Sequence, residues 1–566
     1  MNHSSSVSGR TQRQWRKEER WLEWLCLGSL WISALFLFCS GLNQGPLLDG
    51  QEATLAQVAK EIIQASPSQF EVLQDFSATL SGNNAIPEAM KNVAINDPWF
   101  FPTLWGQPYF DHSFLVPSLI AIAYQWGGIH EWTTRLPIAL LTSLSVPLFY
   151  KASKELFFTR LTAFFAGFVY LTLLFVAYWG SLGTVNGVVL FCTVLLMDGV
   201  LRSRRDLRAS LEVGLALTGL LFTEPLLGIL LSATVIGFWA WDTPRLLQSP
   251  SIAFGVLLGL VPAIAWYGYQ WEQYGSVFLQ EILSPQEFTA QGQWFKLVLF
   301  YGLKLSLYSL PWLIFAIYGW QITWKSQYWS WARFILSWSG GYTLLLLLMP
   351  GYWEAALIPL FPLLALTVAI ALIQLRNFPL IVPYPKPLRL ALLGFALISV
   401  LVTAAIAFNW PINWLSTHEQ PFALLILFFL SFTLIMSANL MDRHRTEFIP
   451  ILMWGIYVSL VLFVNTPFGL EGFSENYPVK PVASLIQTTV PPNQLIYTSF
   501  PRERSSLNFY SNHPVIPAEK KELLKYWQKN KSPYLLVDGE TLSSLKKSSV
   551  KLLGESVSDL YLITKK

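Results

Sequence analysis

Long apolar stretches separated by short polar segments run through most of this chain. Between residues 21 and 468 there are about thirteen stretches near the roughly 20 residues that a helix needs to cross a membrane. Lipid offers the backbone no hydrogen-bond partner, so such segments must form helices. The pattern therefore predicts a polytopic α-helical membrane protein. The expected spans are 21–42, 131–150, 161–181, 185–201, 209–223, 225–241, 251–270, 296–319, 330–349, 356–375, 388–408, 421–440 and 449–467.

Positive charges fall on alternate loops, which indicates the orientation of the chain. The amino-terminal tail, residues 1–20, is basic and lacks a cleavage pattern, so we expect a retained cytoplasmic end. An odd number of crossings then leaves the carboxyl end outside the cell's inner (plasma) membrane. The other basic residues on the tail's side are Lys151, Lys154, Arg160, Arg202, Arg204, Arg205, Arg208, Arg245, Lys325, Arg376, Lys386, Arg389, Arg443 and Arg445.

The apolar stretch 113–125 is an exception to the span pattern. If it crossed the membrane, the arginine cluster at 202–208 would be translocated, against the positive-inside rule. We therefore expect it to lie on the outer surface as a juxtamembrane helix. The segment before it, 43–112, is rich in acidic residues and is also expected outside.

From residue 471 the composition changes to that of a small soluble domain. Apolar periodicity predicts helices at 479–490 and 519–530 and strands at 494–500, 532–537 and 560–564. The expected organisation is a cytoplasmic basic tail (1–20), a transmembrane domain (21–470) that includes an external loop (43–130), and an extracytoplasmic α/β domain (471–566).

Composition narrows the possible functions. The chain is 53% hydrophobic and only 13% charged, with a formal net charge of +4. Its basic cluster is of the kind that flanks membrane spans, so nucleic acid is not an expected partner. Cys26, Cys39 and Cys192 are isolated thiols, which predicts neither a disulfide nor a metal site. Transport has little support, because no internal repeat is visible.

Two polar patches stand where chemistry at the membrane surface is possible. The first is 45–61, with Asp49 and Glu52 just after the first span, and the second is 97–115, with Asp111 and His112 near its end. Polar groups beside an apolar bilayer tend to have perturbed proton affinities, which general acid–base catalysis can use. A solvated acidic loop is the plainer interpretation of the same residues.

The order of these landmarks resembles a family, the integral membrane glycosyltransferases that use a polyprenyl-phosphate sugar donor. Lipid A aminoarabinose transferases and protein O-mannosyltransferases are examples, and their fold is termed GT-C. Residues 99–110 follow the family pattern Trp-x-x-Pro-x-x-x-Gly-x-Pro-Tyr-Phe. The resemblance extends over nearly the whole chain, through Arg135-Leu-Pro, Thr223-Glu-Pro, Met349-Pro-Gly-Tyr, Leu357-Ile-Pro-Leu-Phe-Pro and, in the tail, Leu507-Asn-Phe-Tyr.

The resemblance implies an inverting transfer of a sugar from a polyprenyl phosphate to a lipid, glycan or protein acceptor. An acidic residue of the first external loop would be the general base, and cations would stabilise the leaving phosphate. Gln51 stands where the family has an aspartate, so Glu52, Asp49 and Asp111 are the candidate bases. The resemblance implies substrate binding by Arg135, by His112 if it is protonated, and by Tyr109 of the motif. Lys304 lies within an apolar span, where it could bind a lipid phosphate or reach toward the outer surface. No cofactor is expected, and the histidines are too scattered to predict a metal site.

Several family cations are replaced here. The acid-lysine step after Tyr-Phe is Asp111-His112, and Glu224 takes the place of a lysine after Thr223. Together with Gln51, these replacements favour a second hypothesis, a non-catalytic relative that binds a lipid or a partner protein. The sugar and the acceptor are not indicated by the sequence.

Overall fold

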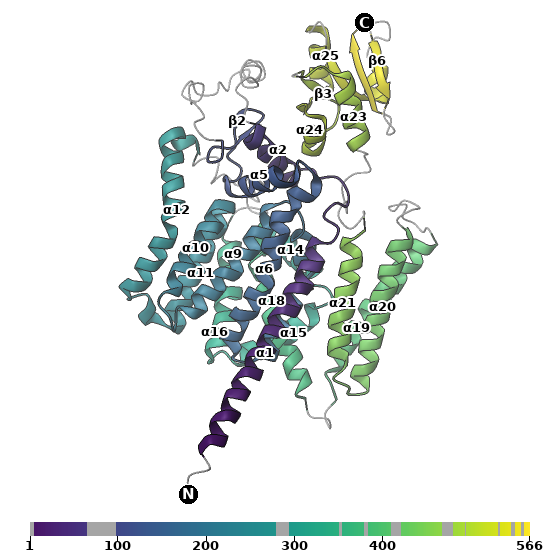
Figure 1. Ribbon diagram of the computed structural model, residues 1–566. Helices are drawn as coiled ribbons and strands as arrows, with labels where there is room; N and C mark the ends of the chain where they lie inside the picture. Colours follow the sequence, from purple (N-terminus) through teal and green to yellow (C-terminus); the bar gives the residue numbers. More distant parts are fainter. Residues whose placement is uncertain are drawn as a thin grey trace. The chain divides into compact units, whose positions relative to one another are not determined.

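The computed structural model describes residues 5–64, 98–278, 294–349, 354–378, 383–408, 420–466, 479–492, 494–529, 533–544, 550–555 and 560–565 (Figure 1). The chain divides into two compact units. The first, the membrane unit, comprises residues 1–42 and 138–470. The second, the outer unit, comprises residues 43–137 and 471–566.

The membrane unit is built from helices alone within the described residues. They are α1 (Ser5–Cys39), α6 (Glu131–Phe157, which starts in the outer unit), α7 (Arg160–Leu171), α8 (Leu174–Trp179), α9 (Val185–Arg202), α10 (Ala209–Thr223), α11 (Pro225–Asp242), α12 (Pro250–Tyr274), α14 (Trp294–Tyr308), α15 (Leu313–Lys325), α16 (Ser330–Leu336), α17 (Tyr342–Leu347), α18 (Leu360–Arg376), α19 (Lys386–Ala407), α20 (Gln420–Asp442) and α21 (Phe448–Val464).

The protein is a multi-pass membrane protein. Within the described residues, eight helices are long and apolar enough to cross a membrane, or nine if the pair α14 and α15 forms one span. The expected stretch 296–319 is wrong as one continuous helix, because α14 and α15 are bent by 110° at a break that contains Pro311. Proline lacks the amide hydrogen that a helix interior needs. The stretch 161–181 likewise forms two helices, α7 and α8.

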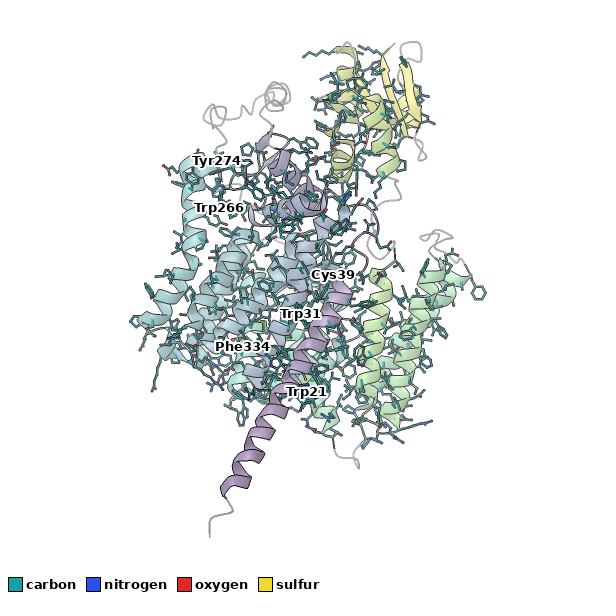
Figure 2. The ribbon with its side chains drawn as sticks, in the orientation of Figure 1. Trp21, Trp31, Cys39, Trp266, Tyr274 and Phe334 are labelled. Atoms are coloured by element: carbon teal, nitrogen blue, oxygen red, sulfur yellow. The ribbon has the colours of Figure 1, made fainter. Side chains whose placement is uncertain are left out.

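Helix α12 shows how these spans face two environments. Its buried positions recur at helical spacing and include Gly259, Trp266 and Tyr274, whereas Phe254 and Ile264 are exposed. Figure 2 labels Trp266 and Tyr274 on this helix. An apolar face that is not covered by protein is typical of a helix in contact with lipid.

Glycines bring α10 and α12 together. A Cβ atom added to Gly259 would lie 2.6 Å from the backbone nitrogen of Leu215, and one added to Gly214 would lie 2.3 Å from the carbonyl oxygen of Val256. The Thr218 hydroxyl donates a hydrogen bond to the Gly259 carbonyl oxygen at 2.8 Å. Small residues that let backbones approach are the usual basis of helix packing in membranes.

The outer unit combines the first loop with the carboxyl-terminal region. Helix α2 (Gln51–Gln64), the hairpin β1 (Thr103–Leu104) and β2 (Gln107–Pro108), and helix α5 (Leu115–Gly127) come from the first loop. Helix α5 confirms the helix expected at 113–125. Its 13 residues span about 20 Å, less than the ~30 Å hydrocarbon core.

The carboxyl-terminal region is a five-stranded mixed sheet with strand order β4-β3-β5-β7-β6. Strands β3, β4 and β5 are parallel, and β7 pairs antiparallel with β5 and β6. Every element expected from the sequence is present. These elements are α23 (Val479–Thr489), β3 (Ile496–Thr498), α25 (Lys520–Lys529), β5 (Tyr534–Asp538) and β7 (Leu560–Lys565). The region also contains α24 (Ser505–Ser511), β4 (Val515–Pro517), α26 (Gly539–Ser544) and β6 (Val550–Glu555).

Replacing Gly259 by alanine should destabilise the membrane unit. The added methyl group meets the backbone of α10, so the two helices must separate, at a cost of roughly 1–3 kcal/mol. Gly268→Ala on the same helix is the matched control, because nothing lies within 4 Å of its added Cβ. Thermal unfolding in detergent should show a lower Tm for Gly259→Ala alone; equal Tm values for both variants would contradict the packing described here.

Candidate active site

A buried ion pair joins two of the candidate residues. The Arg135 Nε atom lies 2.7 Å from Oε1 of Glu52, its Nη2 atom lies 3.1 Å from Oε2, and both side chains have no exposed surface. The Leu48 backbone nitrogen donates to the same Oε2 at 2.8 Å. Both carboxylate oxygens of Glu52 therefore accept hydrogen bonds within the protein.

The rest of the Arg135 guanidinium holds the loop before α2. Its Nη1 atom donates to the carbonyl oxygen of Gln44 at 2.7 Å, and its Nη2 atom donates to that of Pro46 at 2.9 Å. Arg135 lies near the start of α6, so this one side chain connects α6, the loop and α2. The geometry favours a role in positioning for both Glu52 and Arg135.

Asp49 connects the first loop to the carboxyl-terminal sheet. Its Oδ1 atom accepts hydrogen bonds from the backbone nitrogen of Ser506, at 3.0 Å, and from the Ser506 hydroxyl. Arg504 lies 3.9 Å away. Ser506 is in the first turn of α24, where a carboxylate satisfies an otherwise unpaired amide. Asp49 is thus engaged at the start of α24.

Tyr510 and Glu131 form a second connection within the outer unit. The Tyr510 hydroxyl donates to Oε1 of Glu131 at 2.8 Å and accepts from the backbone nitrogen of Leu47 at 2.9 Å. The Lys480 ammonium lies 2.7 Å from the same Glu131 oxygen. Phe509 packs on the apolar side of the loop, against Leu47 and α2. The Leu-Asn-Phe-Tyr segment therefore holds the first loop against the sheet domain.

Two of the departures from the family pattern, Gln51 and His112, contact each other. The Gln51 Nε2 atom lies 2.8 Å from Nε2 of His112. Asp111, the preceding residue, is exposed, and His112 is partly buried. An acid and an imidazole thus stand side by side in sequence at the exit of the β1-β2 hairpin.

Tyr109 and Lys304 complete the predicted set. Tyr109 is buried with 7% of its surface exposed, and its backbone nitrogen donates to the carbonyl oxygen of Pro102 at 3.0 Å, which extends the hairpin. Lys304 belongs to the membrane unit, on α14, where its Nζ atom lies 5.9 Å from the ring centre of Phe300 and 5.7 Å from that of Tyr308. The roles proposed for both residues stay predictions.

The structure adds a residue that the sequence interpretation did not select, Glu61. Its Oε1 atom accepts hydrogen bonds from the backbone nitrogen of Trp105, at 2.7 Å, and from Nε2 of Gln57, at 3.0 Å. Its Oε2 atom accepts from the Thr103 hydroxyl at 3.0 Å and from the Gly106 nitrogen at 3.4 Å. Burial raises the pKa of the Glu61 carboxyl, although these four donors favour its ionised form.

A sequence signal for Glu61 did exist. It is an acid in the last turn of α2, where the partial negative charge of the helix end disfavours a carboxylate. A carboxylate in that position therefore suggests that specific hydrogen-bond donors stabilise it. Three of the four donors come from a hairpin about forty residues later, a pairing that helical periodicity does not reveal.

Breaking the Glu52–Arg135 pair should destabilise the outer unit. Removing one partner leaves a buried charge without its counterion, which typically costs about 3–5 kcal/mol. We expect Glu52→Gln and Arg135→Met to lower Tm, whereas a substitution at exposed Glu540 should change stability by no more than about 0.5 kcal/mol. A Glu52→Gln protein with wild-type Tm but no activity would instead assign Glu52 to the chemistry.

Comparison with known proteins places this geometry in context. Residues 111–269 match the family model described as dolichyl-phosphate-mannose-protein mannosyltransferase. No curated protein matches the chain by sequence. Among solved structures, ArnT from Cupriavidus metallidurans in the apo state matches with a TM-score of 0.70 at 14% identity, covering 97% of this chain and 98% of that chain.

The same ArnT bound to undecaprenyl phosphate matches with a TM-score of 0.67 at 14% identity, covering 96% of this chain and 97% of that one. At this identity the likeness shows the fold, and the fold is shared over nearly the whole chain. The family model matches residues 111–269, and the solved structures share the fold of nearly the whole chain. Both findings agree with the resemblance to the integral membrane glycosyltransferases seen in the sequence.

Proposed function

We propose that this protein is an inverting glycosyltransferase that moves a sugar from a polyprenyl-phosphate donor to a lipid, glycan or protein acceptor on the outer face of the membrane. The observation that carries the proposal is the position of Asp111 and His112. Both residues directly follow the family motif, and His112 contacts Gln51. The ArnT structure with undecaprenyl phosphate supports a donor of that class.

Asp111 is the residue proposed as the general base. Its side chain is exposed and directly follows the family motif, whereas Glu52 is buried in an ion pair with Arg135. The carboxylate would take the hydroxyl proton as the hydroxyl oxygen bonds to the anomeric carbon. The bond from that carbon to the phosphate oxygen breaks, and the electron pair leaves with polyprenyl phosphate.

Charge on the leaving phosphate needs cationic or hydrogen-bonding partners. His112 is proposed for this role, because it follows Asp111 in the sequence and its ring contacts Gln51. Lys304, in the membrane unit, stays a predicted ligand of a lipid phosphate, since an intramembrane cation is costly and usually functional. Tyr109 precedes Asp111 by two residues and is proposed to line the same site.

A second function is favoured by a specific observation. Gln51 has no ionisable group, and the one acid beside it in sequence, Glu52, forms a buried ion pair. A relative that binds a polyprenyl phosphate or a partner protein without turnover would need no base here. Binding of undecaprenyl phosphate without transfer from any donor would favour this alternative.

Replacing Asp111 by asparagine should reduce transfer strongly while leaving the fold intact. Loss of a general base typically lowers the rate by about 100-fold or more. The assay uses purified protein, a panel of polyprenyl-phosphate sugars and labelled acceptor lipids, with kcat and Tm measured for each variant. Glu540→Gln, an exposed acid on α26, is the control.

Two results would count against these assignments. Full activity in Asp111→Asn would exclude Asp111 as the base, and Glu52→Ala and Asp49→Ala would then decide between the other acids. No transfer by the wild-type protein with any donor in the panel would overturn the enzymatic proposal itself.

The proposed orientation places the amino-terminal tail in the cytoplasm and residues 471–566 outside. In a variant whose three cysteines are replaced by serine, a maleimide that cannot cross membranes should label Glu540→Cys in intact cells. It should label Ser8→Cys only after the cells are permeabilised. Labelling of both positions under the same condition would contradict the proposed topology.

A further inference from the structure

The β1-β2 hairpin contains an unusual turn that depends on an acceptor outside itself. Trp105 and Gly106 both have positive φ, 52° and 76°, as the central residues of a type I′ turn do. A positive φ is uncommon for a residue with a large side chain such as tryptophan. The backbone nitrogens of both turn residues donate to Glu61. The Glu61 carboxylate therefore stabilises a turn for which Gly106 is well suited and Trp105 is not.

The hydrogen bonds at Glu61 also fix where the hairpin lies on α2. The Thr103 hydroxyl, at the start of β1, donates to the carboxylate atom Oε2. Glu61 thus binds the first strand and the turn at once, through donors at Thr103, Trp105 and Gly106. Gln57, one helical turn earlier, donates to Oε1 and orients the carboxylate.

Helix α2 holds the far end of the same segment at a second point. Gln51 contacts His112, four residues after β2 ends at Pro108. Gln51 and Glu61 are ten residues apart on α2, which corresponds to about 15 Å along the helix axis. The segment from Thr103 to His112 is therefore attached to one rigid helix at both of its ends.

We propose that Glu61 is a positioning residue of the glycosyltransferase site, which holds the β1-β2 hairpin on α2 and thereby places Asp111 and His112. This inference rests on the proposed function for its catalytic consequence. Its structural part, the attachment of the hairpin, stands on the three hydrogen bonds that Glu61 accepts from the hairpin. Displacement of reacting groups by about 1 Å is enough to lower a rate by about 100-fold.

The direct test is Glu61→Gln, which turns an amide NH2 toward two of the four donors. We expect amide hydrogen exchange in the peptide covering 99–110 to rise at least about tenfold, with kcat falling at least about tenfold and Tm little changed. Glu61→Asp keeps both acceptor oxygens, so it should recover part of kcat. Gln64→Ala, an exposed position on the same helix, is the matched control.

A second route to the same hairpin keeps the test independent of one variant's folding. Gly106→Ala strains the turn because of its positive φ. If Glu61 acts through the hairpin, Glu61→Gln combined with Gly106→Ala should cost little more than either change alone, because both release the same element. Fully multiplicative losses of kcat would contradict this route.

The outcomes separate the two levels of inference. The proposal is overturned if amide exchange in the 99–110 peptide is unchanged in Glu61→Gln. It is also overturned if exchange is faster but kcat and the affinity for undecaprenyl phosphate stay at their wild-type values. If the wild-type protein binds undecaprenyl phosphate but transfers no sugar, the proposed enzymatic function fails by itself. The affinity of the Glu61 variants for undecaprenyl phosphate then decides whether Glu61 positions the binding site.

Discussion

A guanidinium group without solvent contact imposes the main constraint on the outer unit. The Arg135 side chain has no exposed surface, and removing a charge from water is affordable only where ionic and hydrogen-bonding partners surround it. Glu52 supplies a two-point contact, and the carbonyl oxygens of Gln44 and Pro46 accept the remaining donors. These partners fix the start of α2 beside the start of α6. Gln51 and Glu61, which contact His112 and the β1-β2 hairpin, lie on the same helix α2.

Helix α2 can serve several neighbours because its faces carry different chemistry. Glu52 and Glu61 are nine residues apart, two and a half turns, so they point to opposite sides. One side receives Arg135 and the other receives the hairpin. Between them, Ala53 and Ala56 are fully buried and allow Phe509 of α24 to approach closely. Small side chains in the middle and carboxylates toward both ends make α2 a scaffold for segments far apart in sequence.

The sequence predicted elements with a regular period and missed contacts between distant segments. Helices such as α12 follow from long apolar runs, whereas the 296–319 stretch was wrongly predicted as continuous because hydropathy does not register the effect of Pro311. In the sheet domain the prediction lacked α24, β4, α26 and β6, because elements of three to seven residues carry little periodicity. Arg135 was selected from the family motif, but its pairing with Glu52, 83 residues away, leaves no local signal.

Gln51 and Glu52 show how a rigid site can retain chemical freedom. They are adjacent on α2 and therefore point about 100° apart. Glu52 commits its charge to a buried pair, and this charge holds the loop in place. Gln51 makes a neutral contact with His112, in which either partner can donate, depending on the imidazole tautomer and the amide orientation. A rotatable amide can hydrogen-bond to an imidazole in either protonation state. An acid at position 51 would instead favour the protonated, cationic imidazole. Gln51 can thus orient the His112 ring without imposing a charge on it.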